Sequence, residues 1–145
     1  MKTDSSINAI FEVDQKTKVQ CPLFTSGVSA GFPSPAEDHI DRKLDLNELL
    51  ISHPVATFFV RVAGDSMKDA GINHGDLLVV DRSLEATSGT IVIAIVNGEL
   101  TVKTFVQDST SCQLIAANPA YPPVDITEDI DFSVWGVVTS VIHQF

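Results

Sequence analysis

The sequence predicts a compact, mostly antiparallel β domain that carries one short helix and a flexible N-terminal arm. Two observations favour β structure: runs rich in valine, isoleucine and phenylalanine fill the second half, and Asn97-Gly98 separates two of these runs. A third observation places the arm, because residues 1–39 are polar or rich in proline and glycine. With 145 residues, 44% of them hydrophobic, the chain is long enough to bury a core without a disulfide or a metal.

The first third of the chain is predicted to be irregular apart from one helix. Residues 1–20 show no clear apolar period and are expected to form a flexible arm. Residues 21–39 contain several prolines and glycines, which interrupt helices and sheet ladders, so they are expected to form an extended linker or loop. A short helix should follow Asp45, because Glu48 stands three residues later, as in a capping box.

The rest of the chain has the composition of β-strands. Short runs of β-branched and aromatic residues are separated by turn-forming residues, which is typical of a compact antiparallel fold. The expected strands are residues 56–63, 77–81, 90–96, 99–106 and 134–143.

The predicted hairpin assigns an unusual position to Lys103. A two-residue Asn97-Gly98 turn pairs Val96 with Glu99, which places Lys103 opposite Val92, in a largely apolar strand. The ordinary interpretation is an exposed strand face on which the ammonium reaches water. The alternative is a desolvated lysine whose pKa is lowered, so that its amine can act as a base.

A second candidate functional residue, Ser66, follows the predicted strand at residues 56–63. In Gly64-Asp65-Ser66-Met67, a serine after a strand end can expose its hydroxyl close to backbone N–H groups, although such tetrapeptides also occur in ordinary turns. An esterase with a Ser-His pair would need His74 as its base, and the sequence offers no clear acidic residue to orient it.

Composition and residue spacing argue against direct DNA binding, metal or cofactor binding, and membrane contact. Residues 31–145 contain six basic and sixteen acidic residues, which account for the net charge of −10 and disfavour direct DNA binding. Cys21 and Cys112 lack metal-ligand spacing, so no metal or other cofactor is expected. The longest apolar run is residues 91–96 and no secretory signal is evident, so we expect no membrane contact and a cytoplasmic location.

Taken together, these segments resemble the LexA-type self-cleaving serine peptidase family, in its UmuD/MucA branch. The motifs occur in a fixed order over about residues 19–142, which is far more specific than any one of them. They are A-G-F-P-S-P-A at 30–36, D-L-N-E-L-L at 45–50, H-P-V-A-T at 53–57, G-D-S-M at 64–67, G-I-N-H-G-D-L-L-V-V-D at 71–81, E-L-T-V-K at 99–103 and W-G-V-V at 135–138.

The resemblance implies a LexA-like peptidase fold and a specific chemistry. Ser66 would be the nucleophile and Lys103 the general base, with backbone N–H groups of Ser66 and Asp65 as candidate oxyanion donors. The scissile bond would join Ala30 to Gly31, so that residues 1–30 are an arm removed by self-cleavage. Residues 31–145 would form the peptidase and polymerase-accessory domain.

The resemblance also implies partners and a biological role. The chain would be a homodimeric accessory subunit of a UmuC-type DNA polymerase in SOS-response translesion synthesis, with cleavage stimulated by a RecA filament on single-stranded DNA. The alternative is a catalytically idle dimeric binding module of the same fold. A signal peptidase, which also uses serine and lysine, would need a membrane anchor that the sequence does not show.

Overall fold

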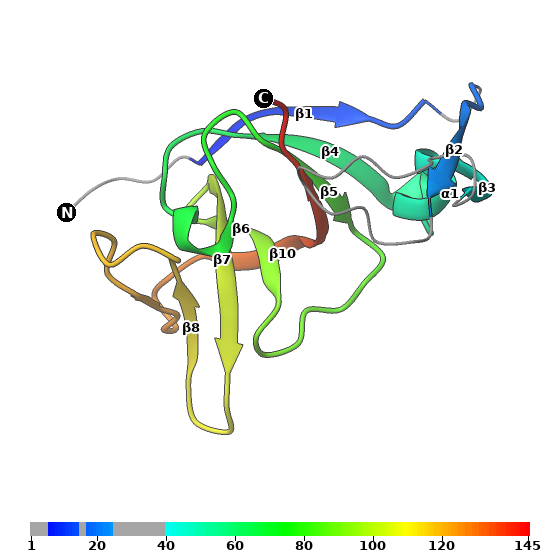
Figure 1. Ribbon diagram of the computed structural model, residues 1–145. Coiled ribbons are helices and arrows are strands. Elements are labelled where there is room, and N and C mark those ends of the chain that lie inside the picture. The colour runs from blue at the N-terminus through cyan, green and yellow to red at the C-terminus, as the bar shows by residue number, and fades with distance from the viewer. Residues whose placement is uncertain (1–5, 15–16, 25–39) are drawn as a thin grey trace. The chain divides into compact units, whose positions relative to one another are not determined.

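The computed structural model describes residues 6–14, 17–24 and 40–145 of the chain (Figure 1). The predicted scissile pair, Ala30 and Gly31, lies outside these residues. The described residues divide into two compact units, residues 14–52 and the remainder, which are considered separately below.

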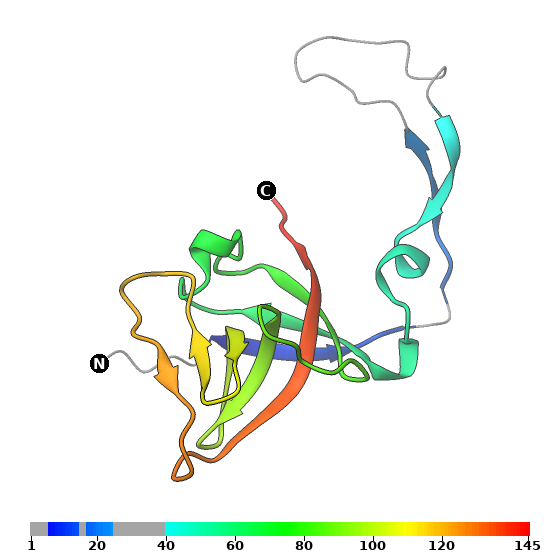
Figure 2. The same cartoon turned by 90° about the horizontal axis from the view of Figure 1, so that it is seen from below.

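The larger unit is built on one eight-stranded antiparallel sheet with the order β1-β4-β5-β10-β6-β7-β8-β9. Strand β1 runs alongside β4 at one end of this order (Figure 2). The strands are β1 (Ile7–Glu12), β4 (Thr57–Val62), β5 (Leu77–Asp81), β6 (Ile91–Val96), β7 (Glu99–Gln107), β8 (Cys112–Ile115), β9 (Val124–Asp125) and β10 (Phe132–Ile142); two 3₁₀ turns are η2 (Pro54–Ala56) and η3 (Lys68–Ala70).

The mostly β prediction is confirmed, and all five predicted strands are present within one or two residues of their expected ends. The hairpin register is also confirmed, because Val96 pairs with Glu99 and Val92 pairs with Lys103. Asn97 and Gly98 have φ angles of 48° and 84°, which are the left-handed values that a two-residue hairpin turn requires.

Three strands of the larger sheet were not predicted. The expectation of a flexible arm is wrong for residues 7–12, which form β1 through backbone pairing with β4. Ile10 and Phe11 of β1 are 38% and 48% exposed, so this strand buries too little apolar surface to leave a clear pattern in the sequence. Strands β8 and β9 have only four and two residues, which is too short for a clear strand pattern in the sequence.

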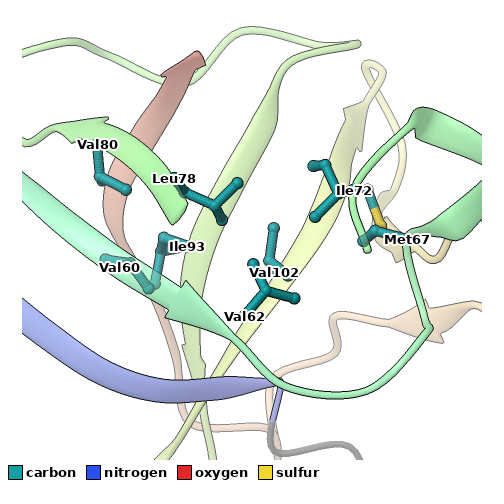
Figure 3. Packing of buried hydrophobic residues seen from close by; sticks show 8 residues of the cluster. All are labelled: Val60, Val62, Met67, Ile72, Leu78, Val80, Ile93 and Val102. Atoms are coloured by element: carbon teal, nitrogen blue, oxygen red, sulfur yellow. The ribbon is translucent and has the colours of Figure 1, made fainter. Parts of the chain in front are cut away.

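Two apolar clusters cover opposite faces of the central strands. Ile93 of β6 belongs to the first cluster, whereas its neighbours Val92 and Ala94 belong to the second. Met67 and Ile72, from the segment after β4, lie at the same end of the first cluster (Figure 3). The residue that follows Ser66 is therefore anchored in the core.

The smaller unit contains a two-stranded ribbon, β2 (Gln20–Phe24) and β3 (Ile40–Asp45), followed by helix α1 (Leu46–Leu50). Strand β2 begins at the last residue of the predicted flexible arm and runs into the segment predicted as a loop, so the irregular prediction is wrong for residues 20–24. Pro22 pairs with Lys43, a position that an edge strand tolerates for proline. The predicted helix cap is confirmed, since the Asp45 carboxylate accepts a hydrogen bond of 2.8 Å from the backbone N–H of Asn47.

Candidate active site

Ser66 stands just after the C-terminal end of β4, in a tightly held turn. Gly64 adopts a φ of 83°, a left-handed value that a glycine reaches without strain and that turns the chain away from the strand. The backbone carbonyl of Asp65 accepts hydrogen bonds from the Lys68 N–H (3.2 Å) and from Nδ2 of Asn118 (3.0 Å). These contacts hold the backbone directly before Ser66, and Ser66 itself is buried, at 2% exposed.

A second segment supports the same turn from the other side. The backbone N–H of Ala117 donates to the Met67 sulfur at 3.3 Å, and the Ala117 carbonyl accepts from the Asp69 N–H at 2.9 Å. The hydroxyl of Tyr121 donates to the Asp65 carboxylate at 2.9 Å. These contacts come from residues after β8, so the course of that strand helps to hold the serine.

Lys103 lies in β7 and is 4% exposed, so the interpretation of a lysine that reaches water from an open face is wrong. Its Nζ lies 3.4 Å from Ser66 Oγ, 2.7 Å from Thr101 Oγ1 and 3.1 Å from the carbonyl oxygen of Val102. The structure therefore brings together the two side chains that the sequence nominated from segments 37 residues apart.

Ser66 and Lys103, which are called the dyad below, meet beside a part of β7 that β8 does not cover. Strand β8 pairs with β7 from Thr104 to Gln107 only, which leaves the outer edge of Val102 without a strand partner. Side chains take over there, because the Val102 N–H donates to Ser6 Oγ at 2.8 Å and the Val102 carbonyl accepts from Lys103. The edge is satisfied and still leaves room for a lysine beside a serine.

The backbone N–H of Ser66 is a candidate oxyanion donor, and among the described residues no backbone acceptor for it is found. The carboxylate of Asp65, in contrast, accepts a hydrogen bond from Tyr121. The assignment of Ser66 and Asp65 N–H groups to an oxyanion hole remains a prediction.

His74 is not placed as a base for Ser66. Its Nδ1 accepts a hydrogen bond of 3.0 Å from the Gly64 N–H, and the side chain is exposed. Two other histidines pair with buried carboxylates on either end of β5: His53 with Asp81 at 2.6 Å, and His143 with Asp76. In the described ranges no three histidine, cysteine or acidic side chains gather in a way that would hold a metal ion.

Both buried carboxylates are tuned by their hydrogen bonds. Burial raises the pKa of Asp81, but hydrogen bonds from Ser83 and His53 outweigh it and hold the pKa below its ordinary value. The pKa of Asp76 is lowered in the same way, since hydrogen bonds from the Asn73 N–H and His143 outweigh its burial. These groups are structural acids, and neither contacts the serine or the lysine.

Comparison with known proteins gives a family match. Residues 22–139 match the family model described as Peptidase S24-like, a range that includes both Ser66 and Lys103. The chain belongs to this family of LexA-type serine peptidases.

Its relatives place it in the UmuD/MucA-like part of that family. The chain is 49% identical to Protein SamA of Salmonella typhimurium over 85% of both chains, and 43% identical to Protein MucA of Escherichia coli over 90% of both. It is also 40% identical to the LexA repressor of Pseudomonas chlororaphis, over 81% of this chain and 58% of the repressor. The resemblance inferred from the motifs is thus confirmed.

Sequence reasoning missed four residues that support this S24-like site. Asn118, Tyr121 and Ala117 lie beyond β8, where only the folded course of the chain shows that they reach the serine turn. Ser6 lies in a polar segment and carried no signal at all. Thr101 stands two residues before Lys103 in β7, and its role emerged only from the 2.7 Å contact.

Proposed function

We propose that this S24-like peptidase cleaves the bond between Ala30 and Gly31 of its own kind of chain, with Ser66 as nucleophile and Lys103 as general base. The observation that carries the proposal is the buried contact of 3.4 Å between Lys103 Nζ and Ser66 Oγ. A lysine and a serine rarely meet in a protein interior without a function, because burying an ionisable group is costly.

We infer that the reactive form of Lys103 is a neutral amine that faces the serine. A neutral amine has two N–H groups and one lone pair, and two acceptors lie beside it, Thr101 Oγ1 and the Val102 carbonyl. If these take both N–H groups, the lone pair points toward Ser66 Oγ, as a general base requires. Burial adds to this by penalising the ammonium form.

The reaction then follows acyl-transfer chemistry. Lys103 accepts the Ser66 hydroxyl proton while Ser66 Oγ bonds to the Ala30 carbonyl carbon, and the resulting oxyanion is held by backbone N–H groups. The lysine returns the proton to the Gly31 nitrogen as the peptide bond breaks. Water then hydrolyses the Ser66 ester, with Lys103 again acting as base.

The small fraction of lysine that is neutral near pH 7 explains why such a peptidase would be slow until triggered. A lysine in water is neutral about once in a thousand at pH 7.4, which corresponds to roughly 4 kcal/mol. Docking of an apolar cleavage segment over the dyad would complete its desolvation and reduce that cost. A RecA filament on single-stranded DNA, implied by the family, would act by favouring the docked state.

The role proposed for the chain is that of its UmuD-like relatives. It would act in SOS mutagenesis as a cytoplasmic homodimer that joins a UmuC-type polymerase after cleavage. Support comes from the similarity to SamA, ImpA and MucA over most of the chain and from the acidic composition, which favours protein partners over direct DNA contact. No helix in the described part of the chain is long and apolar enough to cross a membrane.

Mass spectrometry of the purified protein, incubated with and without activated RecA filaments, tests the cleavage. The expected products are residues 1–30 and 31–145, formed faster with RecA and absent in Ser66→Ala. A cut at another bond, or an intact chain in the presence of active filaments, would contradict the proposal and favour an idle binding module.

Two further measurements test the proposed partners. Analytical ultracentrifugation should show a dimer at micromolar concentration. Gel shifts at low salt should show no tight binding of the isolated protein to DNA, because its net charge is −10. A monomer in the first experiment, or salt-sensitive tight binding in the second, would remove the corresponding partner from the account.

A further inference from the structure

One residue of the N-terminal arm, Ser6, contacts the residues next to Lys103 of the proposed dyad. Ser6 directly precedes β1 and is 1% exposed, although it belongs to a segment with no apolar pattern. It also lies outside residues 22–139, the range that matches the peptidase family. The burial of Ser6 is therefore a feature of this chain that lies outside the matched peptidase domain.

Ser6 connects the two strands on which the dyad depends. Its carbonyl oxygen accepts a hydrogen bond of 2.6 Å from the N–H of Ala63, at the end of the strand that leads to Ser66. Its Oγ accepts a hydrogen bond of 2.8 Å from the N–H of Val102, the residue beside Lys103. One residue thus joins β4 to β7 across the open edge that β8 leaves.

The Ser6 hydroxyl also touches the lysine's own partner. Ser6 Oγ lies 3.1 Å from Thr101 Oγ1, which in turn lies 2.7 Å from Lys103 Nζ. A buried chain of polar groups therefore runs from Ser6 through Thr101 and Lys103 to Ser66. Neighbouring hydrogen bonds in such a chain determine one another's direction.

We propose that Ser6 is a positioning residue for the peptidase, which orients Lys103 through the hydroxyl of Thr101. The inference rests on the proposed function of the dyad and adds a residue from outside the family domain. The hydrogen bond between the Ser6 and Thr101 hydroxyls, in which either can donate, restrains the direction of the Thr101 hydroxyl, and Thr101 Oγ1 accepts an N–H from the Lys103 amine. With Thr101 restrained, the Lys103 amine stays positioned beside Ser66 Oγ.

Loss of the Ser6 hydroxyl would relax this arrangement in two ways. The Thr101 hydroxyl could turn its proton toward the lysine lone pair, in competition with Ser66. The Val102 N–H would also lose its acceptor at the strand edge, and with it the fixed spacing between β4 and β7. Both changes lower the fraction of molecules in which base and nucleophile are aligned.

The position of Ser6 has a consequence for the product. Ser6 precedes the predicted bond between Ala30 and Gly31, so cleavage leaves it on the small fragment. The cut therefore removes the covalent link between the dyad and the residue that orients it. After cleavage, Ser6 would be retained at the site by noncovalent contacts only, the pairing of β1 with β4 among them.

The test uses the full-length chain and its RecA-independent self-cleavage at alkaline pH. Ser6→Ala removes the hydroxyl, and Ser6→Cys keeps the side chain's size with only a weak acceptor, which guards against a fold defect caused by a cavity. Ser88→Ala is the matched control, because Ser88 Oγ also accepts an N–H of β7, from Gln107 at 3.1 Å, but at an exposed site. Thr101→Val and its double variant with Ser6→Ala complete the set.

We expect Ser6→Ala and Ser6→Cys to slow cleavage about tenfold, the loss expected for one aligned hydrogen bond, while Ser88→Ala keeps the wild-type rate. The effects of Ser6→Ala and Thr101→Val should combine to less than their product in the double variant, because part of the Ser6 effect acts through that hydroxyl. Equal rates for Ser6→Ala and Ser88→Ala would overturn the inference, as would multiplicative effects of Ser6→Ala and Thr101→Val. If the wild type itself shows no Ser66-dependent cleavage, the proposed function fails before the inference is reached.

Discussion

The two halves of strand β7 satisfy the same backbone requirements by different means. From Thr104 to Gln107 the strand lies between β6 and β8, and its outer backbone groups are paired by another strand. Around Val102 the outer groups are instead paired with the Ser6 hydroxyl and the Lys103 amine. Thr101, Val102 and Lys103 are buried although no strand pairs with their outer edge, whereas Phe105 is the buried residue of the half that pairs with β8.

This difference explains where the candidate site can form. A strand edge paired with another strand has its backbone groups satisfied by backbone, whereas an edge paired with side chains holds hydroxyl and amine groups in fixed positions. The half covered by β8 stabilises the fold through Phe105 and Leu114, and the open half carries the dyad. Substitutions in the two halves should therefore have separable effects on stability and on cleavage.

The largest expected effect belongs to the open half. Ser66→Ala and Lys103→Ala should each reduce self-cleavage by roughly a thousandfold or more, and the double variant should be no slower, because the two residues act as one unit. Circular dichroism should show a folded protein in each case. RecA-stimulated cleavage that persists in either single variant would show that the dyad does not catalyse the reaction.

In the half covered by β8, the expected effect is on stability. Leu114 is 1% exposed, so Leu114→Ala should lower the free energy of unfolding by about 2–5 kcal/mol through lost burial and a new cavity. Urea denaturation measures this, with Leu84→Ala as the control, because Leu84 is 40% exposed. If cleavage below the unfolding transition fell as strongly as in Lys103→Ala, the two halves would not be separable.

A smaller effect is expected from acid, at the carboxylates of β5. Because the pKa of Asp81 is lowered by folding, its ionised form stabilises the native state above the ordinary carboxyl pKa of about 3.9, and this stability is lost as pH falls through the native pKa. Asp81→Asn should therefore reduce the loss of stability between about pH 5 and pH 2. Asp69→Asn, at an exposed site, is the control; an identical acid slope in wild type and Asp81→Asn would contradict the assignment.

The sequence predicted the part of the site that local patterns encode. The Asn97-Gly98 turn determined the hairpin register, and that register alone placed Lys103 opposite Val92. The strand before Gly64 placed Ser66 at a strand end. Their contact could be expected only from the order of several motifs, because it depends on how the sheet brings β7 next to the turn after β4.

The parts that could not be predicted depend on backbone pairing or on distant contacts. Strand β1 is held by its ladder to β4 and exposes apolar side chains, so its pattern resembles that of a coil. Ser6 is buried because strands remote in sequence close around it, and a lone serine in a polar segment gives no sign of this. Asn118 reaches the serine turn for the same reason.

The pH dependence of RecA-independent self-cleavage tests the central claim, that Lys103 acts as the base for Ser66, most directly. Product formation is followed by mass spectrometry from pH 7 to pH 10 in wild type, with Ser66→Ala as the control for hydrolysis unrelated to the site. If the neutral amine is the base, the rate should rise close to tenfold per pH unit until the lysine has titrated, and then level off. A wild-type rate that is flat over this range, as a histidine base with an ordinary pKa of about 6.5 would give, would contradict the account.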